Sequence, residues 1–235
     1  MNRATRSYLA EFIGTFTLVF VGTTVATLQG GPFADFYGNN GWLGIALAFG
    51  GTLMVLVYTI GPVSGCHLNP AVSLPMALSG RLPMAHLLPY IVAQCLGGLA
   101  ASFVLLQLLG GVPGYELAKH GLGANGNPQH LAIGSLMGFE IIQTALFLLT
   151  IFTVTHKLAP AGFAGIAIGG YLFMAHLIGV PLGDASLNPA RSLGPALLVG
   201  GDALNILWLF IVGPLVGGLI GWGLFMAIHG EEPAA

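Results

Sequence analysis

The chain has 235 residues, of which only 6% are charged and 55% are hydrophobic, and its formal net charge at pH 7 is -2. A soluble domain carries about 25% charged residues, so this composition excludes an ordinary water-soluble protein and indicates an integral, all-α membrane protein. The weak negative charge also excludes a nucleic-acid-binding surface, which needs clustered Lys and Arg.

A helix crosses the hydrocarbon core of a bilayer with about 20 mostly apolar residues. Six segments have this character: 9–28, 42–60, 84–109, 131–155, 161–180 and 203–229. We therefore expect six transmembrane helices in a single domain covering residues 1–235. The longest connection, 110–130, is rich in Gly and contains the turn signals Asn125-Gly126 and Asn127-Pro128, which predict an exposed loop.

An even number of spans places both termini on one side of the membrane. If that side is the cytoplasm, most basic residues outside the spans fall on it, namely Arg3, Arg6, Arg81 and Lys157, whereas Lys119 falls outside. The excess of Lys and Arg in cytoplasmic loops therefore predicts cytoplasmic termini and a multi-pass protein of the cell membrane. Arg191 does not belong to this pattern and needs a separate explanation.

The two halves of the chain, approximately 7–109 and 131–229, resemble each other. The run Leu68-Asn69-Pro70-Ala71 returns as Leu187-Asn188-Pro189-Ala190, and the membrane carboxylate Glu11 has a counterpart in Glu140. Each half contains three spans, so the second half is inserted upside down relative to the first. This arrangement is an inverted repeat, with its axis in the membrane plane.

Each Asn-Pro-Ala run precedes an apolar stretch that is too short to cross the membrane, Val72–Leu78 in the first half and Ser192–Val199 in the second. Asn is favoured as a helix N-cap and Pro at the first helical position, so each run predicts a helix start. Asn-Pro is also an ordinary turn dipeptide, but two copies in repeat register favour half-helices. Non-helical backbone at membrane depth is tolerated where it lines a wet cavity, so the two runs predict a pore.

The runs 64–72 and 186–192 resemble the two signature motifs of the aquaporin, or major intrinsic protein, family, most closely those of its bacterial water channels. The similarity extends over the whole chain. It implies the hourglass fold, with six tilted helices and two re-entrant half-helices. It also implies a homotetramer in the lipid bilayer with one pore per subunit, water as the permeant, and no cofactor.

The resemblance also assigns roles to individual residues. The pore motifs are Asn69, Pro70, Ala71, Asn188, Pro189 and Ala190, and the selectivity filter is Phe49, His176, Ala185 and Arg191. Glu11 and Glu140 would hold the re-entrant loops, and His67 would line the cytoplasmic vestibule. Taken without the resemblance, Phe49, His176 and His67 could be packed core residues, Arg191 a surface anchor, and the two carboxylates a proton relay.

The filter set favours water over glycerol. The glycerol facilitators of the family carry a wider, more apolar filter with Gly at the position of His176, and an Asp where this chain has Ser192. Ala185 stands where water-selective members usually have Thr or Cys, which predicts a slightly wider filter.

Other functions remain as alternatives. A glycerol facilitator is the first, and a secondary transporter, whose pathway would need ion-binding or proton-relay residues, is the second. A purely structural junction protein is a third. Cys66 and Cys95 lack the spacing of a metal site and are too few for a disulfide framework, and no nucleophile–base pair or phosphate-binding loop predicts an enzyme.

Overall fold

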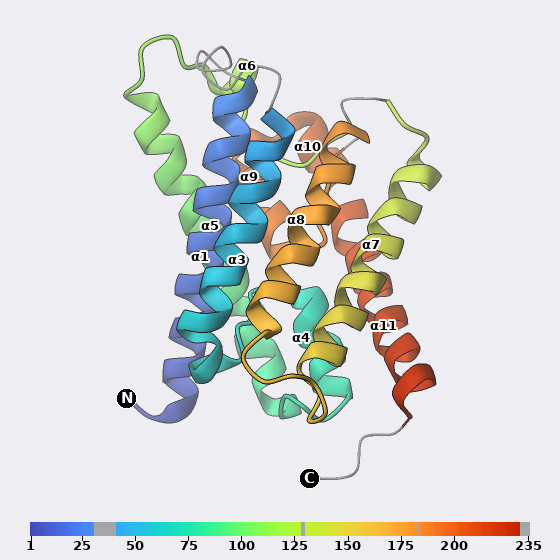
Figure 1. Ribbon diagram of the computed structural model, residues 1–235. Coiled ribbons are helices and arrows are strands. Elements are labelled where there is room, and N and C mark those ends of the chain that lie inside the picture. Colours follow the sequence, from blue (N-terminus) through green and yellow to red (C-terminus); the bar gives the residue numbers. More distant parts are fainter. Residues whose placement is uncertain (31–40, 128–129, 183, 231–235) are drawn as a thin grey trace.

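The computed structural model describes residues 1–30, 41–127, 130–182 and 184–230, whose helices form the bundle in Figure 1. Within these ranges six long helices run through the bundle: α1 (Arg3–Gly30), α3 (Gly41–Ser64), α5 (Met84–Gly110), α7 (Ile133–Val154), α8 (Ala164–Leu182) and α11 (Leu209–His229). Each is long and apolar enough to cross a membrane, the last together with the short helix α10 (Gly201–Asn205). The six predicted spans are confirmed.

Two helix boundaries differ most from the prediction, by six residues each. Helix α1 already begins at Arg3, because the helix continues beyond the apolar stretch with the side chains of Arg3 and Arg6 exposed. The last predicted span, 203–229, is interrupted by a turn at 206–208 between α10 and α11. Hydropathy locates the apolar part of a span, whereas hydrogen bonding decides where its helix begins and ends.

Two shorter helices do not cross the bundle: α4 (Pro70–Leu78) and α9 (Pro189–Val199). Helix α4 lies toward the end of the bundle where α1 begins and α11 ends, and α9 lies toward the opposite end (Figure 1). Both begin as predicted, with Pro in the first turn. The side chain of Asn69 accepts a hydrogen bond from the backbone N–H of Ala71, and that of Asn188 accepts one from Ala190. The Asn-Pro-Ala runs are therefore helix starts and not ordinary turns.

Each half-helix packs against the last long helix of the other half of the chain, α9 against α5 and α4 against α11. Glycines allow this close approach. A Cβ built on Gly98 would lie 2.4 Å from the carbonyl oxygen of Ala190, and one built on Gly218 would lie 2.4 Å from that of Ala71. Both carbonyls belong to the first turn of a half-helix, so the missing side chains at these glycines let the half-helices fit into the bundle.

Gly98→Ala is therefore expected to destabilise the fold by roughly 1–3 kcal/mol, because the new methyl group displaces the first turn of α9. Gly223→Ala is the matched control, since a Cβ at this position of α11 meets nothing within 4 Å. Its stability should be unchanged or slightly higher. Thermal unfolding in detergent measures both variants, and equal melting temperatures would contradict the packing argument.

The described part of the segment 110–130 is largely exposed, as its turn signals predicted, but the prediction is wrong for Leu122 and Asn125, which are buried. The segment forms the short helix α6 (Leu117–His120) and then turns inward, where Leu122 packs on α5 and only 2% of the surface of Asn125 is exposed. The second turn signal ends at Pro128, which lies outside the described residues. Turn residues indicate where the backbone bends. They do not indicate which side chains face inward, because packing decides that.

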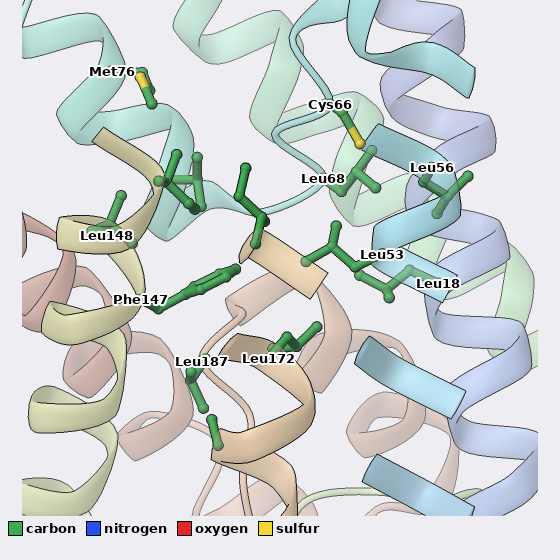
Figure 2. Packing of buried hydrophobic residues seen from close by; sticks show 14 of the residues in the cluster. Leu18, Leu53, Leu56, Cys66, Leu68, Met76, Phe147, Leu148, Leu172 and Leu187 are labelled. Carbon is green, nitrogen blue, oxygen red and sulfur yellow. The ribbon is translucent and has the colours of Figure 1, made fainter. Parts of the chain in front are cut away.

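Apolar side chains from four long helices meet in the middle of the bundle (Figure 2): Leu18 from α1, Leu53 from α3, Phe147 and Leu148 from α7, and Leu172 from α8. Leu68 and Leu187, which directly precede the two N-cap asparagines, belong to the same cluster. The two half-helix starts are therefore held in an apolar surrounding at the centre of the bundle.

Candidate functional site

Three hollows follow one another through the bundle. The central one is a cavity of about 220 Å³ that reaches from Arg191 to Arg81. Arg81 and His67 also line a wider hollow of about 650 Å³, the inner vestibule. On the other side, Gly123 and Asn125 contact Arg191 and line an outer hollow of about 920 Å³. Because a water molecule occupies about 30 Å³ in the liquid, the central cavity has room for several.

The wall of the central cavity combines two kinds of surface. Most of it is apolar, with Leu53, Phe147 and Leu172 among its side chains. Polar groups come from the non-helical segments ahead of the two half-helices, through the stretch 65–67 and Ser186, and from side chains at the two ends, including Arg81 and Arg191. A small molecule inside therefore meets hydrogen-bonding groups on the re-entrant segments and at both ends, and an apolar wall between them.

The two N-cap asparagines line this cavity and bind the opposite re-entrant segment. The Nδ2 of Asn69 donates to the carbonyl oxygen of Leu187 at 2.7 Å, and the Nδ2 of Asn188 donates to that of Leu68 at 2.9 Å. A carboxamide nitrogen carries two hydrogens. Each asparagine thus has a second N–H available for a molecule in the cavity.

The residues before the asparagines adopt a backbone conformation that is unusual for residues other than glycine. Leu68 has φ 53° and Leu187 has φ 57°, both in the left-handed region. This conformation costs about 1–2 kcal/mol for an L-residue. This conformation turns each leucine carbonyl toward the asparagine of the other half. The strain is therefore needed for the two hydrogen bonds that join the half-helix starts.

Three of the predicted filter residues meet at the end of the cavity next to the outer hollow. The rings of Phe49 (α3) and His176 (α8) stack with their centroids 4.4 Å apart, and the Cζ of Arg191 (α9) lies 4.8 Å from the centroid of the Phe49 ring. All three line the cavity and are almost fully buried. The structure thus brings together residues that are far apart in the sequence.

His176 and Arg191 each present one unpartnered polar atom. The Nδ1 of His176 lies 2.9 Å from the carbonyl oxygen of Leu172, which can only accept, so Nδ1 carries the proton. In the neutral ring the Nε2 is then an acceptor. This Nε2 and the Nε of Arg191 are buried without a hydrogen-bond partner within the described residues. Both residues line the cavity, so this end of it combines an acceptor on His176 with N–H donors on Arg191.

Ala185, the fourth predicted filter residue, is fully buried beside this group. A Cβ built on Gly179 would come within 2.6 Å of both the Ala185 Cβ and the ring of Phe139. The Ala185 side chain therefore packs against α8, while its carbonyl oxygen accepts a hydrogen bond from the Nδ2 of Asn125 at 3.1 Å.

Glu11 binds the first re-entrant segment. Its Oε1 accepts from the hydroxyl of Ser64 at 2.7 Å and from the backbone N–H of His67 at 2.9 Å. Its Oε2 accepts from the N–H of Leu68 at 2.6 Å and from the Nε2 of Gln94 at 2.7 Å. Four donors thus surround one buried carboxylate.

Glu140 has the corresponding place beside the second re-entrant segment, with fewer contacts. Its two carboxylate oxygens accept from the backbone N–H of Ser186 at 2.8 Å and of Leu187 at 2.9 Å. The backbone pair 186–187 matches the pair 67–68 of the first half. The two carboxylates therefore bind equivalent backbone groups, and Glu11 has two additional side-chain partners.

His67 lines both the central cavity and the inner vestibule. Its Nδ1 lies 3.1 Å from the hydroxyl of Ser73, and its ring meets that of Tyr90 edge to face. The contacts with Ser73 and Tyr90 hold the ring at the junction of the two hollows.

Sequence reasoning missed the residues that surround Arg191 on its outer side. The guanidinium donates from NH1 to the carbonyl oxygen of Gly123 at 2.9 Å and to the Oδ1 of Asn125 at 2.6 Å. Next to them the Asp184 carboxylate accepts from the backbone N–H groups of Ala185 and Gly126. Burial raises the pKa of Asp184 above its ordinary value, and the positive charge of Arg191 opposes this rise. The sequence signals in this loop, its Gly content and the pairs Asn125-Gly126 and Asn127-Pro128, predicted only turns.

Comparison with known proteins places this geometry in a family. A family model described as "Major intrinsic protein" matches residues 1–225. Aquaporin Z of Rhodopseudomonas palustris is 45% identical over 233 residues, which cover 97% of this chain and 95% of that protein. The protein of the same name from Bradyrhizobium diazoefficiens is 43% identical, over 97% of this chain and 95% of that protein. The one from Brucella melitensis is 44% identical, over 95% of this chain and 97% of that protein.

Among solved structures, the X-ray structure of the aquaglyceroporin from Plasmodium falciparum resembles this chain with a TM-score of 0.80. The likeness covers 94% of this chain and 95% of that one, at 24% sequence identity. At this identity the comparison concerns the fold.

Proposed function

This chain belongs to the major intrinsic protein family, and we propose that it is a passive water channel whose path runs from the inner vestibule through the central cavity to the outer hollow. The observation that carries the proposal is a cavity of about 220 Å³ lined by the free N–H groups of two asparagines and closed on its outer side by an arginine filter. The relatives at 43–45% identity are all named Aquaporin Z.

Proton exclusion follows from the two asparagines. A water oxygen that accepts hydrogen bonds from Asn69 and Asn188 directs both of its own hydrogens along the pore, away from the centre. It then cannot accept a proton from a neighbouring water, so the chain of hydrogen bonds is interrupted. The N-termini of α4 and α9, each equivalent to about half a positive charge, add an electrostatic barrier to cations at the same place.

Selectivity among neutral solutes follows from the filter formed by Phe49, His176, Ala185 and Arg191. The stacked rings of Phe49 and His176 narrow the opening, and the lining by His176 and Arg191 supplies an acceptor and N–H donors, which suit water. A glycerol facilitator would need a wider opening, so we do not favour that alternative.

We assign a scaffolding role to Glu11 and Glu140 rather than a proton relay. All of their hydrogen-bond partners given above belong to the re-entrant segments or to helices beside them, and the same backbone pair is bound in each half. The reciprocal hydrogen bonds of Asn69 and Asn188 fit two inverted repeats, approximately 7–109 and 131–229. A secondary transporter would instead use membrane carboxylates to couple ions to transport.

We further propose a homotetramer with a separate pore in each subunit and with both termini in the cytoplasm. The complete path lies within one chain, and the long helices keep large apolar side chains exposed on their outer faces, including Leu47, Val92 and Ile220. Such faces suit lipid or neighbouring subunits. The molar mass of the protein in detergent, measured by light scattering, tests the tetramer.

Ala185→Thr is expected to tighten the filter against small neutral solutes. Ala185 is fully buried and its side chain packs against α8 at Gly179, so the larger Thr side chain has no free space there, and we expect it to narrow the filter. Thr adds a methyl and a hydroxyl group, so urea flux into proteoliposomes should fall at least about tenfold, the lower end of the effect of one extra methylene in a fitted site, while water still passes. Ala185→Gly is the control and should not lower the urea flux. An unchanged urea flux in Ala185→Thr would contradict this reading of the filter.

The channel itself is tested by stopped-flow light scattering on proteoliposomes. Vesicles containing the protein should shrink much faster than empty vesicles under a mannitol gradient, and glycerol should enter both kinds at similar rates. Saturable, ion-coupled uptake in place of an osmotic response would support a transporter.

A further inference from the structure

Asn125 is a loop residue whose side chain lies inside the protein. It belongs to the segment between α6 and α7, where its sequence context predicted a turn, yet only 2% of its surface is exposed. Its Nδ2 donates to the carbonyl oxygen of Ala185, and its Oδ1 accepts from NH1 of Arg191 and from the hydroxyl of Ser192. The side chain of Asn125 thus binds Ala185 in the second re-entrant segment and Arg191 and Ser192 in the first turn of α9.

The chemistry of these contacts requires a carboxamide of this length. Ala185 presents a carbonyl oxygen and needs a donor, whereas Arg191 presents N–H groups and needs an acceptor. Asn supplies both on one planar, uncharged group. An aspartate would keep the acceptor and lose the donor, and a leucine of similar size would lose both.

The loop that carries Asn125 is itself fixed on both sides. Gly123 has φ 60°, and a Cβ built there would lie 2.8 Å from the carbonyl oxygen of Thr23, so the loop touches α1 at this point. On the other side the N–H of Gly126 donates to Asp184 at 3.2 Å. The position of the Asn125 side chain is therefore determined by the fold and not by Arg191 alone.

Asn125 in turn decides how the guanidinium of Arg191 is oriented. NH1 is bound on the loop side by Gly123 and Asn125, while Nε has no partner within the described residues and the Arg191 side chain lines the cavity. The contact with Asn125, at 2.6 Å, is the shorter of the two and is charge-assisted. Without it, the guanidinium would be held on this side by the Gly123 carbonyl and could turn away from Phe49.

We propose that Asn125 is a positioning residue of the selectivity filter: it fixes the orientation of Arg191 and its distance from Ala185, and thereby sets which solutes pass. The proposal rests on the filter assigned under the proposed function. It adds a determinant of selectivity that lies on the loop between the two halves of the chain and outside both signature motifs.

The test compares Asn125→Leu with Asn127→Leu in proteoliposomes. Asn127 is the matched control because it is a carboxamide of the same loop whose two hydrogen bonds both go to the backbone of Leu131. Asn125→Leu should raise the ratio of glycerol to water permeability about tenfold, the factor expected from losing one charge-assisted hydrogen bond. Asn127→Leu should leave the ratio within about twofold of wild type. Equal ratios in the two variants would overturn the proposal.

A double-mutant cycle separates positioning from general damage to the loop. If Asn125 acts through Arg191, adding Asn125→Leu to Arg191→Val should not change the permeability ratio further. An equal additional rise in the Arg191→Val background would overturn the proposal. Asn125→Ala, which only removes atoms, serves the same cycle if the leucine variant does not fold. Wild-type vesicles that conduct no water would instead refute the proposed function, so the two failures are distinguishable.

Discussion

Replacing His176 with Gly is expected to let glycerol through the channel, with a rise in glycerol permeability of about tenfold or more. The His176 ring stacks on Phe49, and its Nε2 has no hydrogen-bond partner within the described residues. The substitution therefore widens the opening and removes an acceptor at the same time. Water flux should persist, because the two asparagines of the central cavity are unchanged.

The matched control for this variant is His86→Gly. His86 lines the inner vestibule, where its Nδ1 contacts the hydroxyl of Tyr8, far along the path from the filter. The His86→Gly variant should exclude glycerol as the wild type does. Stopped-flow light scattering under a glycerol gradient measures both variants. Unchanged glycerol exclusion in His176→Gly would show that the narrowest part of the path lies elsewhere.

Glu11→Gln is expected to lower the yield of folded protein, and to lower it more than Glu140→Gln does. The glutamine NH2 must replace one carboxylate oxygen, and at Glu11 either oxygen accepts from two donors. At Glu140 each oxygen accepts from one backbone N–H. A hydrogen bond to a charged group contributes about 1.5–3 kcal/mol, so two are lost in the first variant and one in the second.

Glu116→Gln, on the exposed side of the loop, is the control and should fold like the wild type. Fluorescence-detected size-exclusion chromatography after heating orders the three variants by stability. A Glu11 or Glu140 variant that folds normally but abolishes a proton-coupled flux would refute the scaffold role and support a transporter.

The sequence was most informative where local chemistry determines structure. Apolar length located the six spans, and the preferences of Asn and Pro located the starts of α4 and α9, because a helix cap is formed within a few residues. The paired runs 68–71 and 187–190 also indicated that these starts belong together. All of these features depend on short-range hydrogen bonding or on simple composition.

The filter and its support could not be derived in the same way. Phe49 and His176 lie on different helices, and only the resemblance to a family joined them before the fold was known. Asn125 was predicted to lie in an exposed turn, because turn propensity describes the backbone and does not tell whether the side chain points inward. The proton position on His176 likewise depends on the carbonyl of Leu172, a contact that no pattern of apolar residues records.

The most direct test of the account is to measure water and proton movement in the same proteoliposomes. Osmotic water flux should be fast and should have a low activation energy, because water meets only the hydrogen bonds of Asn69, Asn188 and the filter. A pH-sensitive dye inside the vesicles should report the same slow decay of a pH gradient as in empty vesicles. A gradient that collapses faster when the protein is present would contradict the proposed arrangement of the two asparagines and half-helices.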